Sequence, residues 1–541
     1  MIQSGTPDIC VIGSGPAGAL LAASLAERNH DVVVLEAGKR FDISENIYRM
    51  EQSLRSDSRT DIWEMGGQRD DYSISGSIDY QLNRRRVKGV GGSTLHWGGT
   101  VPRMHPEDFE MHSRHGLSDD WPISYDDIEP YYLQAEWEMG AAGAPNPFGG
   151  HRSGPYPMDP HPFSYSDRIF QDACEELGIE LHHLPRAINS EAYDGRGMCQ
   201  SYGTCSPACP SGAKYSADVH VQQAEANGVT VIDRAPVQRL EHGSDGEYVE
   251  RAHYIRDGEE HTMEADLFVV ACGAAETPRL LLLSDSDEYP DGLANSSGLV
   301  GRRFIEHIVM RVQGRLDEPT RQHLIGFGTT QTQQFYRYDD GPRGSMLVTP
   351  LNTAGQSPPQ AAVQLEPDLP QLLGADRPSG MTLGDELVNH INEESSGQLS
   401  IACGTDLLPD PENRIGLDTS RTDDHGNPVP DISLDIDSHA IETLERAEGL
   451  LTEIMEATGA DEIRTSPEPE DAFFANHMLG TTRMGTDPEE SVVDPNLKTH
   501  DLENLYLTGG NVFVTGGPAN PTLTIAALTL RLADHIHERL S

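Results

Sequence analysis

The 541-residue sequence predicts a two-lobed α/β protein, with a parallel sheet in one lobe and a mainly antiparallel sheet in the other. Three observations lead to this fold class. Residues 8–36 show the order strand, glycine-rich turn, helix and strand, which is typical of a parallel βαβ unit. Residues 304–365 contain short alternating stretches that indicate antiparallel strands. A strand and a helix return after residue 504, so both chain ends are predicted to build the first lobe.

The individual elements follow from short apolar runs and from helical periodicity. Residues 8–14 and 31–36 are predicted strands, and a helix runs between them from Pro16 to about Asn29. Residues 438–458 are predicted to form an amphipathic helix, because their apolar side chains recur at helical spacing. Residues 41–85 are expected to be irregular. The other predicted elements are a helix over 164–177, strands over 229–233, 265–271 and 505–508, and a helix from Pro521 to about His537.

The surface is predicted to be strongly acidic. The chain has 39 Lys and Arg residues against 87 Asp and Glu residues, a formal net charge of −48. This balance excludes nucleic acid as an expected partner and disfavours anionic lipid, since both need cationic side chains. Only four of the basic residues are lysines. We therefore predict a protein from a salt-loving organism, where salt screens self-repulsion; the alternative is an acidic protein adapted to ordinary salt.

A glycine-rich turn follows the first predicted strand. Gly13, Gly15 and Gly18 have the G-x-G-x-x-G spacing, and Glu36 ends the next strand. In such a unit the glycines allow a tight turn, a close approach of a pyrophosphate, and close helix packing, while the acid binds ribose hydroxyls. The sequence therefore predicts a dinucleotide site, without distinguishing FAD from NAD. The alternative is a glycine-rich loop in a generic α/β protein.

Further motifs run along the chain in a fixed order. They are GVGGSTLHWGG over 89–99, VVACGAAETPRLLL over 269–282, NRIGLD over 413–418, HMLGTTRMG over 477–485, NVFVT over 511–515 and ANPTLTI over 519–525. Together they resemble the glucose–methanol–choline (GMC) oxidoreductases, a family of FAD enzymes, across essentially the whole chain. The resemblance implies FAD as the cofactor, an FAD-binding Rossmann-like lobe and a substrate lobe.

The resemblance also implies which residues contact the cofactor. Small residues at Gly91, Gly92 and Ser93 let the backbone lie close to a flat ring system. His96 matches the place where some relatives tether FAD covalently; the alternative is a histidine that packs beside the flavin. The helix after Asn520 would point its positive N-terminus at the flavin. The other cofactor residues implied are Val237, Gly510, Asn511, Pro521 and Thr522.

Two residues match the catalytic positions of the family. His477 is predicted to accept the proton of a substrate hydroxyl while hydride leaves the same carbon for the flavin. Asn520 is predicted to hold the substrate oxygen by a hydrogen bond. Many relatives have a second histidine where this chain has Asn520, and sugar-oxidising relatives share the asparagine.

A cysteine cluster lies in a loop rich in Gly and Pro. Cys199, Cys205 and Cys209 form a C-x₅-C-x₃-C-P pattern, whose thiolates predict an iron–sulfur cluster. Three ligands favour the three-iron, four-sulfur type. The spacing is similar to that of catalytic subunits of membrane-linked FAD dehydrogenases for glucose, fructose and gluconate. A Cys205–Cys209 disulfide and three unligated thiols are the alternatives.

These observations predict an FAD-dependent dehydrogenase of a sugar, sugar acid or polyol, whose substrate is set by loops of roughly 304–400. The resemblance implies a small partner subunit and a cytochrome or quinone-linked acceptor. The alternatives are an oxidase that makes hydrogen peroxide and a non-catalytic flavoprotein electron carrier. No transmembrane run and no secretion signal are present, which predicts a cytoplasmic protein, or one exported or membrane-associated with a signal-bearing partner. The predicted division is 1–110, 216–303 and 471–541 for the FAD lobe, 111–190 for connecting and substrate segments, 191–215 for the cysteine loop, and 304–470 for the substrate lobe.

Overall fold

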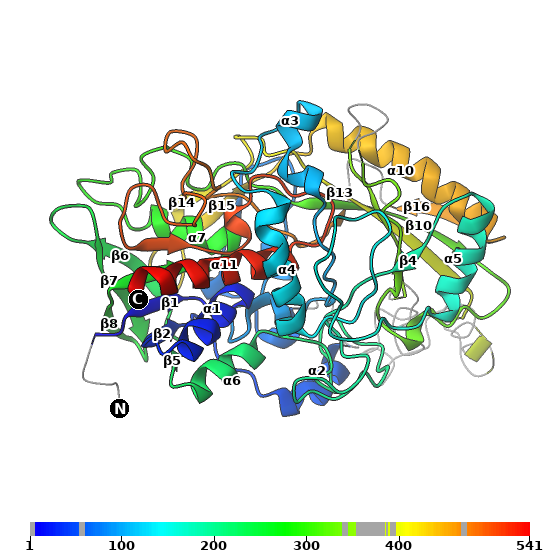
Figure 1. The fold of residues 1–541 in the computed structure, drawn as a ribbon, viewed down its shortest axis with the longest axis horizontal. Coiled ribbons are helices and arrows are strands. Elements are labelled where there is room, and N and C mark those ends of the chain that lie inside the picture. Colours follow the sequence, from blue (N-terminus) through cyan, green and yellow to red (C-terminus); the bar gives the residue numbers. More distant parts are fainter. Residues whose placement is uncertain are drawn as a thin grey trace, which may run out of the picture.

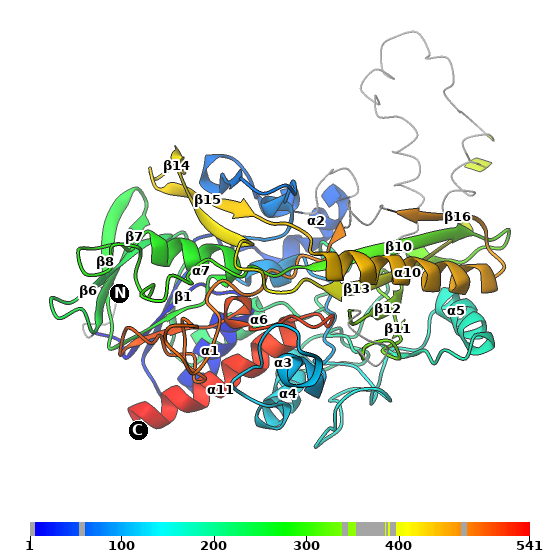
Figure 2. The same ribbon diagram turned by 90° about the horizontal axis from the view of Figure 1, so that it is seen from above.

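The computed structural model describes residues 6–53, 60–337, 344–352, 396–466 and 473–541, with a few more between 385 and 389. It confirms the predicted fold class. Figures 1 and 2 show a lobe with a parallel sheet and several helices at one end of the molecule, and a second lobe with long antiparallel strands beneath helix α10 at the other. Part of the region predicted to set the substrate, 353–384, lies outside the described residues.

The first lobe is built around a five-stranded sheet with the order β18-β9-β1-β2-β5, in which all neighbours run parallel. Helix α1 (Pro16–Glu27) is largely buried and packs against α6 (Asp218–Ala226) and the C-terminal helix α11 (Thr522–Leu540). Both chain ends therefore meet in one lobe, as predicted (Figure 1). The strands are β1 (Ile9–Ile12), β2 (Val32–Leu35), β5 (Thr230–Ile232), β9 (Leu267–Val270) and β18 (Leu505–Leu507).

The second lobe has an antiparallel sheet with the order β12-β13-β10-β16, and a short strand β17 also pairs with β10. Helix α10 (Ser438–Ala457) lies along β10 and β13 in Figure 2, and its buried apolar face packs on both. Its N-terminus is capped by Asp437, which accepts a hydrogen bond from the Ala440 amide at 2.7 Å. The strands are β10 (His307–Arg315), β12 (Leu347–Pro350), β13 (Gln398–Asp406), β16 (Asp461–Ser466) and β17 (Phe473–Phe474).

Several elements were not predicted from the sequence. Residues 41–85, expected to be irregular, contain helix α2 (Asn46–Ser53) and the short strand β3 (Ser73–Ile74). Helix α4 (Tyr125–Met139) begins at a capping box between Ser124 and Asp127, a sequence signal that marks its start. Two elements were predicted: the helix over 164–177 is α5 (Tyr165–Glu176), and β11 (Thr330–Gln331) lies in the stretch 304–365 predicted to form antiparallel strands. The remaining elements are α3 (Met111–His115), α7 (Gly273–Leu282), β4 (His182–His183), β6 (Val237–His242), β7 (Val249–Arg256), β8 (Glu259–Glu264), β14 (Arg414–Thr422) and β15 (Pro428–Ser433).

Candidate active site

A cavity of about 1190 Å³ lies between the two lobes. One wall consists of residues that follow the carboxyl ends of the parallel strands, among them Gly13, Glu36 and Gly510. The opposite wall comes from the antiparallel sheet and includes His307 on β10 and Gly404 on β13. The carboxyl edge of a doubly wound sheet is where such folds bind their ligands. The cavity is therefore placed to hold a dinucleotide against a substrate.

The glycine-rich turn has a distinct structural task at each glycine. Gly13 has a φ of +100°, which few other residues adopt. A Cβ atom at Gly18 would come within 1.9 Å of the Gly13 carbonyl oxygen, so only glycine lets α1 pack on the turn. Gly15 precedes α1 and lines the cavity, and no atom lies within 4 Å of the place where its Cβ would stand. That open space, at the N-terminus of a helix, fits an approaching pyrophosphate.

Glu36 is buried at the carboxyl end of β2 and lines the same cavity. Its carboxylate accepts hydrogen bonds from the Ser14 amide at 2.9 Å, the Ser14 hydroxyl at 2.7 Å and the Gly38 amide at 2.8 Å. Burial raises the pKa of Glu36, against the effect of these donors. The acid is thus held rigidly in the position from which a ribose can be bound.

The second glycine-rich segment packs directly on the first. A Cβ atom at Gly92 would lie 2.8 Å from the Gly15 Cα atom, and the φ of Gly92 is +57°. The buried Lys214 side chain donates to the carbonyls of Leu95 at 3.1 Å and Trp97 at 2.8 Å. The second glycine-rich segment therefore forms a firmly packed part of the cavity wall.

The structure brings most of the predicted cofactor residues to this cavity. Three of them, Gly18, Gly91 and Asn511, lie behind the lining, where Asn511 donates from Nδ2 to the Thr482 hydroxyl at 2.8 Å. Pro521 stands just before the first residue of α11 and not inside its first turn. The predicted cofactor residues that line the cavity are Gly13, Gly15, Glu36, Gly92, Ser93, His96, Val237, Gly510, Pro521 and Thr522.

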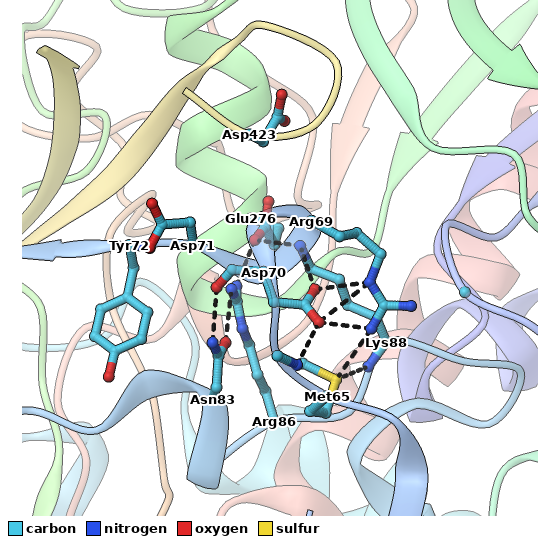
Figure 3. Close-up of polar contacts among 12 residues, drawn as sticks. Met65, Arg69, Asp70, Asp71, Tyr72, Asn83, Arg86, Lys88, Glu276 and Asp423 are labelled. Atoms are coloured by element: carbon cyan, nitrogen blue, oxygen red, sulfur yellow. Dashed lines mark hydrogen bonds and ion pairs between the residues drawn. The ribbon is translucent and has the colours of Figure 1, made fainter. Parts of the chain in front are cut away.

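A network of ion pairs stands beside the cofactor end of the cavity (Figure 3). Asp70 is fully buried and accepts from Arg69 Nη2 at 2.6 Å and from the Gly66 amide at 2.8 Å, and Lys88 Nζ lies 3.3 Å away. Lys88 Nζ also lies 3.1 Å from the Glu276 carboxylate, which Arg86 contacts as well. Sequence reasoning missed this network, although Arg86 and Lys88 stand close together in a chain with few lysines.

Charge balance keeps the acids of this network ionised. Burial opposes ionisation of Glu276, but Lys88, Arg86 and Arg279 lower its pKa well below the ordinary value. Asp70 behaves in the same way, because Arg69 and Lys88 outweigh its burial and lower its pKa. The network therefore ties the segment before the second glycine-rich motif to helix α7.

The predicted catalytic pair meets in the cavity. Asn520 Nδ2 lies 3.0 Å from His477 Nε2, although the two residues are 43 positions apart. Sequence reasoning missed two buried residues that complete this group. His307 Nδ1 lies 2.9 Å from His477 Nδ1, and Glu306 accepts a hydrogen bond from the His477 amide at 2.5 Å. Burial lowers the pKa of His477 to about 3, so its imidazole is neutral near pH 7 and able to accept a proton.

The predicted metal ligands lie in a loop behind His96. The Ser206 hydroxyl, between Cys205 and Cys209, donates to the His96 carbonyl at 2.7 Å. All seven cysteines are free thiols, so the alternative disulfide is not formed. Among the described residues, no group of three or more His, Cys, Asp or Glu side chains is arranged to hold a metal ion. Burial raises the pKa of Cys205 to about 12, which favours its neutral thiol. The described residues thus show no assembled metal site, and the cluster stays a prediction.

A parallel sheet with a dinucleotide turn, whose cavity also holds a neutral histidine and an amide, fits the class of the oxidoreductases. Models of the GMC oxidoreductase family match residues 72–309 and 409–529, and a model of an NAD(P)-binding Rossmann-like domain matches residues 11–49. The chain belongs to the GMC oxidoreductase family. It is an FAD-dependent enzyme, and the cavity described above fits that cofactor.

Similar proteins extend over the whole chain. The large subunit of fructose dehydrogenase from Gluconobacter japonicus is 34% identical over 98% of this chain and 97% of its own. The 2-methyl-1,2-propanediol dehydrogenase of Mycolicibacterium austroafricanum is 30% identical over 99% and 96%. The crystal structure of pyridoxine 4-oxidase from Mesorbium loti has a TM-score of 0.67 at 18% identity, covering 98% of this chain and 99% of that one, which supports the fold. In the described part of the chain, no helix has the length and apolar character needed to span a membrane.

Proposed function

We propose that this enzyme is an FAD-dependent dehydrogenase that oxidises a CH–OH group of a sugar, sugar acid or polyol. The observation that carries the proposal is the neutral His477 opposite Asn520 in the cavity next to the dinucleotide turn. Two similar proteins support the substrate class by their names, which refer to fructose and to a diol.

The residues divide the proposed reaction between them. His477 Nε2 accepts the hydroxyl proton of the substrate, and the Asn520 amide donates a hydrogen bond to the same oxygen. When bound, FAD would supply the acceptor for the hydride that leaves the carbinol carbon. The alcohol thereby loses one proton and one hydride and becomes a carbonyl compound. Ser93, His96 and Gly510 are the lining residues proposed to hold the cofactor near this point.

Anaerobic reduction of the bound flavin tests the proposal. We expect fructose, glucose, gluconate, sorbitol or a small diol to remove the absorbance of oxidised flavin when oxygen is absent. A sample that keeps its oxidised spectrum with every alcohol would favour the non-catalytic electron carrier. Dye reduction without oxygen uptake would then separate the dehydrogenase from the alternative oxidase.

The proposed acceptor is a partner protein and not oxygen. The similarity to a large subunit supports the proposal of a small partner subunit. Electrons would then pass to a cytochrome or to a quinone-linked acceptor. The position of the cysteine loop supports a path for electrons from the cofactor toward this loop, because the loop lies against the backbone of His96. No step of the proposed reaction depends on a metal cluster in that loop.

The predicted three-iron cluster has a direct chemical test. Analysis of the purified holoenzyme for iron and acid-labile sulfide is expected to find both, and a Cys205→Ser variant is expected to lose them. A Cys174→Ser variant is the matched control, because Cys174 is a buried thiol in helix α5, outside the loop. Enzyme without iron that still passes electrons to a dye would remove the cluster from the proposal.

A further inference from the structure

A second histidine stands directly behind the proposed base. His307 is the first residue of β10, it is fully buried, and its Nδ1 atom lies 2.9 Å from Nδ1 of His477. The two rings are nearly perpendicular, with an interplanar angle of 83°. A hydrogen bond between two imidazole nitrogens contains one proton, so one ring must donate and the other must accept.

The contact at the other side of His477 decides which ring donates. The Asn520 amide nitrogen lies 3.0 Å from His477 Nε2, and an amide nitrogen only donates. His477 Nε2 must then carry a lone pair, which places the single proton of the neutral ring on Nδ1. This proton points at His307 Nδ1, which must accept it, so the proton of His307 is on its Nε2 atom.

We propose that His307 is a positioning residue that holds His477 in the tautomer with an unprotonated Nε2 atom. The inference rests on the proposed function, in which that atom takes the substrate proton. Without an acceptor at His307, His477 could carry its proton on Nε2 and donate it to the Asn520 side-chain oxygen after the amide turns over. In that state the base has no lone pair toward the substrate, although every side chain is in place.

The buried Glu306 carboxylate fixes the backbone positions of His307 and His477 relative to each other. Glu306 accepts hydrogen bonds from the amides of His307 at 3.1 Å and His477 at 2.5 Å. Its other oxygen accepts from the Tyr80 hydroxyl at 2.5 Å. This buried carboxyl therefore connects the start of β10 with the segment that carries His477.

Burial favours a neutral pair of histidines, although carboxyl groups stand nearby. Besides His477 and Glu306, the buried Asp406 stands opposite His307 in the register of β10 with β13. Burial lowers the pKa of His307 well below its ordinary value, and a positive charge on His477 would lower it further. The Nε2 atom of His307 is buried without a partner among the described residues, and a Cβ atom at Gly516 would stand 2.7 Å from it.

Two substitutions of nearly equal shape separate tautomer control from packing. His307→Asn keeps an oxygen that can accept from His477 Nδ1, whereas His307→Leu offers none. We expect the leucine variant to lose about 10²–10⁴-fold in kcat/KM and the asparagine variant to stay within about tenfold of wild type. A Gly516→Ala variant, which displaces His307 Nε2, is expected to fall between them. His182→Leu is the matched control, because His182 is buried outside the cavity.

Spectroscopy tests the tautomer without any substrate. Long-range proton–nitrogen correlation spectra of holoenzyme labelled at its histidine nitrogens are expected to show His477 protonated at Nδ1 in wild type and at Nε2 in His307→Leu. The signal is assigned by its loss in His477→Asn. Equal damage from asparagine and leucine, a leucine variant with near-normal kcat/KM, or wild-type His477 protonated at Nε2 would each overturn the proposal. If the proposed oxidation fails because no alcohol reduces the flavin, this spectrum still decides the tautomer.

Discussion

His477→Ala is expected to lower turnover by about 10²–10⁴-fold, the usual effect of losing a general base. The loss follows from the position of His477, whose Nε2 atom faces Asn520 in the cavity while its other nitrogen is engaged by His307. Stopped-flow reduction of the flavin under anaerobic conditions measures this step directly. The variant should still fold and retain FAD, because the dinucleotide turn is built by other residues.

The pH profile gives the same prediction a second readout. A base must be neutral to work, so activity falls as pH drops through its pKa. Burial lowers the pKa of His477 from the ordinary 6.5 to about 3, and the acid limb of kcat/KM is therefore expected well below pH 6.5. Near-normal turnover in His477→Ala, or an acid limb at pH 6.5 or above, would contradict the assignment.

Asp70→Asn is expected to lower the free energy of unfolding by about 3–5 kcal/mol, the usual cost of breaking a buried ion pair. Asp70 is fully buried, and the substitution leaves Arg69 and Lys88 without their shared carboxylate. Because Lys88 and Arg86 line the cavity, the variant should also release FAD more readily. Denaturant unfolding of the holoenzyme, followed by flavin and tryptophan fluorescence, measures both effects.

The neighbouring acid provides the control for this prediction. Asp71 is partly exposed and pairs with the exposed Arg421 at 2.5 Å, so Asp71→Asn is expected to cost no more than about 1 kcal/mol. An equal loss of unfolding free energy in both variants would show that the buried network around Asp70 stabilises the fold no more than the exposed pair does. An unchanged flavin affinity in Asp70→Asn would show that the network does not contribute to FAD binding.

Local patterns predicted the elements whose residues interact with near neighbours. The turn Gly13–Gly18, helix α1 and strand β2 follow from a short apolar run, three glycines and a second apolar run. Helix α10 follows from its periodicity and ends within one residue of the predicted limit. Helix α4 was missed because acids and Pro130 mask its period, although its capping box marks the start.

Contacts between distant segments could not be predicted in this way. The contact of His307 with His477 spans 170 positions and requires β10 to pair with β17 just before His477. The Lys88–Glu276 pair requires the start of α7 to reach the segment before the second glycine-rich motif. Neither pair belongs to a motif with a defined residue spacing, so the sequence alone does not predict these contacts.

Sequence and tertiary structure thus account for different parts of this enzyme. The glycine spacing, the acidic residue at the end of β2 and the ordered motifs are enough for the fold class, the FAD cofactor and the candidate pair His477 and Asn520. The origin in a salt-loving organism stays a prediction from composition. The protonation state and orientation of His477 depend on burial, on Glu306 and on His307. Those properties arise only in the folded chain, where residues of both lobes line the cavity, because solvent exclusion and hydrogen-bond geometry require that packing.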